Sequence, residues 1–146
     1  ELLAHFGDGH ALIPEVLRRT PPEHVIRTDV FDRAPVARWT SARVALLGDA
    51  AHPMTPAMGQ GACQAIEDAV VLAHALGRGG ALAEALANYE QRRVARANGL
   101  VTQSLKVGAI AQLENPLARV LRDTAVRMFG DRMRTRDVEE LYGFSV

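Results

Sequence analysis

One loop of this chain carries residues that could bind a ligand. Asp49 follows a glycine at the end of an apolar run, and Gly59 and Gly61 stand just before an alanine-rich stretch. The carboxylate of Asp49 can accept hydrogen bonds from hydroxyl groups, and the two glycines let a ligand approach the backbone closely. The free N–H groups at the start of a helix favour negative charge. The loop therefore offers an acceptor for hydroxyls and a site for an anion.

A plain structural joint explains the same residues. Strands and helices are often connected through glycines, and Pro53 and Pro56 would stiffen any connection. On the residue types alone, a ligand-binding loop and a structural joint both stay open.

Two elements must position this loop. Residues 43–47 form a continuous apolar run, which is typical of a strand buried on both faces in a parallel sheet. Ligands bind at the carboxyl ends of such strands. Residues 60–76 have the spacing of a helix that ends at Gly77. Its expected buried stripe consists of Ile66, Ala69, Val70, Ala73 and Leu76.

The rest of the chain is mostly helical by pattern. We expect a helical region over 1–19 interrupted at Gly7–Gly9, a strand over 25–31, and a long helix over 82–112. Pro116 suits the first turn of a helix over 117–129, and a short helix is expected around 136–142. Two strands among several helices are too little sheet for a complete doubly wound domain, so the class is α/β with a sheet completed by other sequence.

Bulk composition excludes several classes of protein. The 146 residues have zero formal net charge, which argues against an electrostatic nucleic-acid binder, and no run approaches the length of a membrane span. The start lacks the basic and apolar regions of a signal peptide. Because Cys63 is the single cysteine, no internal disulfide can form, and we expect a cytoplasmic protein. The histidines lack metal-ligand spacing, so no metal site is predicted.

The stretch GDAAHPMTPAMGQGACQAIEDAVVLA, beginning at Gly48, resembles the second flavin-binding motif of the FAD-dependent aromatic-ring monooxygenases, the single-component flavoprotein hydroxylases that include salicylate hydroxylase-like enzymes. Upstream, DRAPVARWTSARVALLGDAAH resembles the same family, as does ALANYEQRRVARANGLVTQSLKVG downstream. The resemblance covers roughly residues 20–108. It implies the C-terminal part of a Rossmann-like FAD-binding fold.

The resemblance also implies roles for the loop. Gly48 and Asp49 would hold the ribityl chain of FAD, and the backbone from Gly59 through Gln60 and Gly61 to Ala62 would lie against the isoalloxazine ring. Pro56 would border the ring on the substrate side and take a catalytic role. The family uses NAD(P)H and O2 to hydroxylate a small aromatic substrate. It further implies that 1–40 end a substrate-binding domain, that 41–77 belong to the FAD-binding domain, and that 78–146 are C-terminal helices.

Three departures limit the resemblance. Ala42 stands where the family often has glycine, which is a minor difference. Ala57 and Met58 replace residues that are often Asn or aromatic, which alters the wall near the flavin and the substrate, so the substrate is not identified. No GxGxxG follows a strand, so the half of the site that would hold the adenine end is absent. We therefore expect a segment of a longer enzyme that needs its N-terminal part as a partner and is inactive alone. An epoxidase or oxidase of the same fold, or an inactive helical interaction module, remain alternatives.

Other polar residues receive structural interpretations. We expect His52 to be a structural residue of the motif, Cys63 a small packing residue, and Trp39 a packing residue at the domain junction. Glu67 and Asp68 are expected to complement the helix dipole at the edge of the packing, not to form a catalytic dyad. Three arginines of the long helix are expected on a solvated face: Arg92, Arg93 and Arg96.

Overall fold

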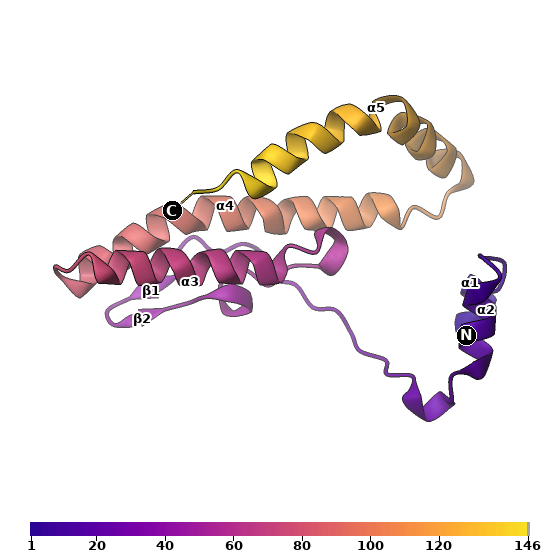
Figure 1. The fold of residues 1–146 in the computed structure, drawn as a ribbon, viewed down its shortest axis with the longest axis horizontal. Helices are drawn as coiled ribbons and strands as arrows, with labels where there is room; N and C mark the ends of the chain where they lie inside the picture. The colour runs from indigo at the N-terminus through magenta and orange to yellow at the C-terminus, as the bar shows by residue number, and fades with distance from the viewer. Residues whose placement is uncertain (146) are drawn as a thin grey trace. The chain divides into compact units, whose positions relative to one another are not determined.

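The computed structural model describes the backbone of residues 1–145 and all of their side chains except those of residues 131–142. The chain divides into two compact units, Glu1–Val30 and Phe31–Val146. Each unit is described by itself below (Figure 1).

The first unit consists of α1 (Leu2–Phe6), α2 (Leu12–Arg19) and the short 3-10 helix η1 (Pro22–His24). The helical prediction for 1–19 is confirmed, with a break at the expected glycines. The predicted strand over 25–31 is wrong, because the residues form no strand. Ile26 has 85% of its surface exposed. A β-branched sequence becomes a strand only where a partner strand supplies hydrogen bonds and a surface to pack against.

A small hairpin opens the second unit. Strands β1 (Thr40–Ser41) and β2 (Val44–Ala45) pair antiparallel, with Thr40 opposite Ala45 and Ser41 opposite Val44. The predicted parallel strand buried on both faces is therefore wrong for this chain, and Val44 is 61% exposed. An apolar run can be buried on two faces only between neighbouring layers, and here only Ala45 and Leu46 pack against the core.

Two long helices form the body of the second unit. Helix α3 (Gly61–Gly77) and helix α4 (Leu82–Ala111) lie side by side and antiparallel, joined by a short turn (Figure 1). Both agree with the predicted helices. Helix α5 (Pro116–Tyr142) is one continuous helix where two shorter ones were expected. Its start is capped by the Asn115 side chain, whose Oδ1 accepts from the amides of Leu117 and Ala118.

The core lies between the hairpin, α3 and α4. Its buried apolar residues include Trp39, Val71 and Tyr89. The predicted buried stripe of α3 is wrong: Ile66 is 65% exposed, and Val70 and Leu76 are also exposed. The face that α3 buries consists of Gln64, Asp68, Val71 and Ala75. Within the part of the chain described, no helix combines the length and apolar character needed to cross a membrane.

Candidate functional site

The loop between β2 and α3 borders a pocket of about 480 Å³. The loop contains two 3-10 turns, η2 (Gly48–Ala50) and η3 (Pro56–Met58). The pocket is lined by Asp49, Met54, Thr55, Pro56, Gly59, Gly61, Ala62 and Ala65. Five of the seven predicted site residues thus meet around one space. The other two, Gly48 and Gln60, are buried.

The start of α3 is open toward ligands. Gly59 adopts a left-handed conformation with φ +64, and a Cβ placed on it would meet no atom within 4 Å. Gln60 occupies the N-cap position, and no described side chain makes a capping hydrogen bond there. The first amides of α3 therefore keep their hydrogen-bonding capacity and the positive end of the helix dipole for a ligand.

Gly48 fixes the other end of the loop. Its φ is +59, and a Cβ placed on it would lie 3.2 Å from the Cβ of Ala65 in α3. Its amide donates a hydrogen bond to Asp68 Oδ2 at 3.0 Å. Left-handed backbone and close packing against α3 both require glycine at this position.

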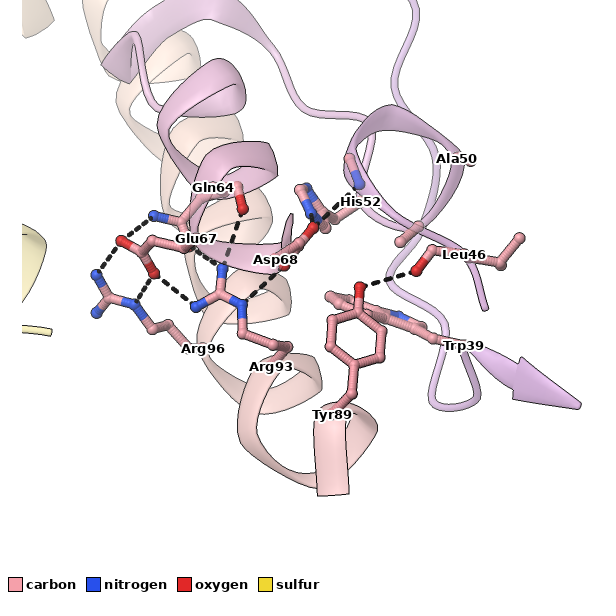
Figure 2. A network of polar contacts seen from close by, with 12 residues as sticks. Trp39, Leu46, Ala50, His52, Gln64, Glu67, Asp68, Tyr89, Arg93 and Arg96 are labelled. Carbon is pink, nitrogen blue, oxygen red and sulfur yellow. Dashed lines mark hydrogen bonds and ion pairs between the residues drawn. The ribbon is translucent and has the colours of Figure 1, made fainter. Parts of the chain in front are cut away.

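Asp68 lies at the centre of a buried polar network (Figure 2). Its Oδ2 also contacts His52 Nε2 at 2.5 Å, and its Oδ1 accepts from Arg93 Nε at 2.7 Å. The three side chains have no exposed surface. Burial by itself raises the pKa of Asp68, but the hydrogen bonds from His52, Arg93 and the Gly48 amide outweigh it and hold the pKa below its usual value. The buried position of His52 agrees with the structural role expected for it.

Arg93 joins α4 to α3 through several further acceptors. Its guanidinium donates to Glu67 Oε2 at 2.5 Å and to Gln64 Oε1 at 2.7 Å (Figure 2). The expectation of a solvated Arg93 is wrong, as is the placement of Asp68 at the packing edge. Charged side chains are buried where ion pairs and hydrogen bonds compensate the lost hydration, as they do here.

Glu67 and Phe144 complete this network. Arg96 donates to both carboxylate oxygens of Glu67, at 2.8 and 2.9 Å. Burial raises the pKa of Glu67, but the hydrogen bond from Arg96 and the charge of Arg93 lower it below its usual value overall. The ring of Phe144 lies 5.1 Å from the Arg93 guanidinium and 4.8 Å from that of Arg96. The aromatic face thus covers both cations.

Helix α4 fixes Thr55, one of the residues that line the pocket. Ser104, which is fully buried, donates its hydroxyl hydrogen to the Thr55 carbonyl at 2.6 Å. Thr55 Oγ1 lies 3.0 Å from Ser104 Oγ and donates to it, because the Ser104 hydrogen is already used. These bonds fix the segment directly before Pro56.

Sequence reasoning missed several residues that hold the loop. Arg33 Nη2 donates to the carbonyls of Ala50 and Ala51, at 3.1 and 2.9 Å. Arg93 had a readable signal: it stands four residues from the apolar residues Tyr89 and Ala97 on either side, so all three share one helix face. The packing role expected for Cys63 is wrong, because that residue is exposed.

A family model described as FAD binding domain matches residues 17–104. The chain therefore belongs to the FAD-binding domain family. This agrees with the flavin motif that the loop resembles.

The chain is similar in sequence to several monooxygenases and hydroxylases. It is 50% identical over 137 residues to aurachin C monooxygenase/isomerase of Stigmatella aurantiaca. The aligned segment covers 93% of the chain and 36% of that protein. It is 37% identical over 141 residues to 2-heptyl-3-hydroxy-4(1H)-quinolone synthase of Pseudomonas aeruginosa, covering 97% of the chain and 37% of the relative. A 3-hydroxybenzoate 6-hydroxylase of Klebsiella oxytoca is 34% identical over 145 residues, or 99% of the chain and 36% of that relative. The chain thus spans little more than a third of these relatives' length.

The chain also resembles solved structures of an FAD-binding protein. A variant of Klebsiella pneumoniae HpxO complexed with FAD superposes with a TM-score of 0.84 at 30% identity, covering 96% of this chain and 37% of that one. HpxO complexed with FAD and uric acid gives a TM-score of 0.75 at 32% identity, covering 89% of this chain and 35% of the other. The expectation of a mostly helical part of an FAD-binding fold is confirmed.

Proposed function

We propose that the complete protein carrying this chain is an FAD-dependent monooxygenase that uses NAD(P)H and O2 to hydroxylate an aromatic or conjugated organic molecule. The observation that carries the proposal is the pocket between the Asp49 turn and the start of α3. Its lining combines a carboxylate with an uncapped helix N-terminus. Two relatives are named as a monooxygenase and a hydroxylase, which supports oxygenation as the reaction class.

The pocket residues fit the ribityl and ring portions of FAD. Asp49 would accept hydrogen bonds from ribityl hydroxyls, with Gly48 setting the turn before it. Gly59 has open space where a side chain would stand, so the backbone from Gly59 to Ala62 can lie against a flat ring. Gln60, whose side chain is buried, would contribute only its backbone.

FAD, when bound, would supply the redox and oxygen chemistry, and the protein's contribution is binding, orientation and field. The amides at the start of α3 would stabilise negative charge on the ring. Pro56 would form the wall on the substrate side, held in place by the bonds between Thr55 and Ser104. We assign Pro56 a catalytic contact on this basis.

The wider organisation belongs to the same proposal. Residues 1–40 would end a substrate-binding domain, 41–77 would complete the FAD-binding domain, and 78–146 would form C-terminal helices. The remaining part of the enzyme would bind the adenine end of FAD. A cytoplasmic location suits the free thiol of Cys63.

Epoxidation is the second candidate reaction. Zeaxanthin epoxidase of an Oncidium hybrid cultivar is 48% identical over 62 residues, which cover 42% of the chain and 9% of that protein. The two reactions are distinguished by supplying the complete protein with FAD, NAD(P)H, a panel of aromatic and polyene substrates, and 18O2. Hydroxylation places one labelled oxygen on a ring carbon, and epoxidation places it across a double bond. NAD(P)H consumption with no labelled product from any substrate would count against both monooxygenase reactions.

A further inference from the structure

We propose that Asp68 is a positioning residue for FAD: it aims Asp49 at the cofactor by holding the residues on both sides of Asp49. The inference rests on the proposed function, because it gives the buried network a purpose in that site. Asp68 itself is absent from the pocket lining.

The two oxygens of Asp68 face different parts of the structure (Figure 2). Oδ2 holds the loop, through the Gly48 amide at 3.0 Å and the His52 ring at 2.5 Å. Oδ1 faces α4 and accepts from Arg93. The carboxylate of Asp68, a residue of α3, thus connects the loop to both α3 and α4.

Asp49 lies between the two held residues. Gly48 directly precedes it and His52 follows three residues later, so the turn that presents Asp49 is fixed at both ends. Because the loop is tied to α3 itself, the same contact sets the distance between Asp49 and the amides at the start of that helix. Those are the two groups that would hold the ribityl chain and the ring.

The environment of His52 makes Asp68 its decisive partner. His52 is buried, and its Nδ1 has no hydrogen-bond partner among the described residues. The Trp39 ring packs against it, with ring centroids 5.2 Å apart. An amide in place of the Asp68 carboxylate has one oxygen and one NH2 group, so in either orientation its NH2 faces a donor, the Gly48 amide or Arg93 Nε. One of these contacts is therefore lost, and the turn would shift to relieve the unpaired donor.

Glu90 supplies a matched control. Its carboxylate also accepts backbone amides, those of Trp39 at 2.6 Å and Thr40 at 2.7 Å, but it ties β1 to α4 and not the Asp49 turn. Glu90→Gln makes the same chemical change as Asp68→Asn. If Asp68 only stabilised the fold, Asp68→Asn and Glu90→Gln would have similar effects on FAD binding.

The test is a double-mutant cycle in the complete protein, with the Kd for FAD and the visible absorption of bound flavin as readouts. We expect Asp68→Asn to raise the Kd about tenfold when Asp49 is present and less than about twofold in the Asp49→Ala background, since it acts through Asp49. The bound flavin spectrum should shift in Asp68→Asn. Glu90→Gln should leave the Kd and the spectrum unchanged.

Equal effects of Asp68→Asn in both backgrounds, or an unchanged Kd and spectrum, would overturn the proposal. If Asp68→Asn does not fold, Arg93→Lys replaces it in the same cycle; it keeps the positive charge but cannot reproduce the guanidinium's bonds. Failure of the parent protein to bind FAD would instead defeat the proposed function. The two failures are therefore distinguishable.

Discussion

Arg93 Nε lies 2.7 Å from Asp68 Oδ1, and neither side chain has exposed surface. The two residues are 25 positions apart and come from different helices, so their pair fixes how α3 packs on α4. Removing one member of a buried pair leaves the other charge without compensation, which costs several kcal/mol. The pair therefore supports both the fold and the loop that Asp68 holds.

The contribution of Asp68 to stability should depend on pH. Because its pKa is lowered in the folded protein, its contribution is fully present above the unfolded value of about 4 and is lost as pH falls through the folded pKa. We expect Asp68→Asn to lower the free energy of unfolding by about 3 kcal/mol at pH 7. This difference from the parent should shrink below about pH 4. Urea unfolding of both proteins between pH 7 and pH 2 measures it.

Glu67 does not confound this comparison. Its pKa is also lowered, but both proteins keep it, so its contribution cancels in the difference. A difference that stayed constant down to pH 2 would mean that Asp68 is not ionised in the folded protein.

Phe144 should stabilise the network from outside. Phe144→Ala removes a ring that faces two guanidinium groups, and we expect a loss of about 1–2 kcal/mol in unfolding free energy. Phe144→Leu keeps an apolar cover without the aromatic face and should lose less. A loss in Phe144→Ala with no loss in Phe144→Leu would show that apolar contact alone matters and would contradict a role for the aromatic face.

Ala42→Gly should stabilise the protein. Ala42 has φ 49 in the two-residue turn between β1 and β2, a conformation that costs a non-glycine residue about 1 kcal/mol. Glycine should recover up to this amount. Ala95→Gly, in the interior of α4 on an exposed position, should have the opposite sign and cost about 1 kcal/mol. Thermal and urea unfolding of both variants check the two signs, and destabilisation by Ala42→Gly would contradict the assigned strain.

The sequence predicted the positions of the helices better than their packing, and five of the seven residues it assigned to the flavin site line one pocket. Periodicity marks helices such as α3 and α4 because their hydrogen bonds are local, and the glycines of the loop mark a backbone geometry that other residues resist. It could not select the face that α3 buries: Ile66 has an apolar side chain yet is exposed, while Asp68 is buried. That choice depends on Arg93, a distant residue whose charge makes burial of the carboxylate favourable. The strand predicted over 25–31 failed for a related reason, since pairing depends on a second segment.

The central claim is that the Asp49 turn and the start of α3 hold FAD, and flavin titration of Asp49→Ala in the complete protein tests it most directly. Loss of hydrogen bonds to a charged acceptor should raise the Kd for FAD at least tenfold, with little change in the unfolding temperature of the FAD-free protein. Glu84→Ala, which removes an exposed carboxylate in the first turn of α4, is the matched control and should leave the Kd unchanged. An Asp49→Ala protein that folds and binds FAD as tightly as the parent would contradict the account.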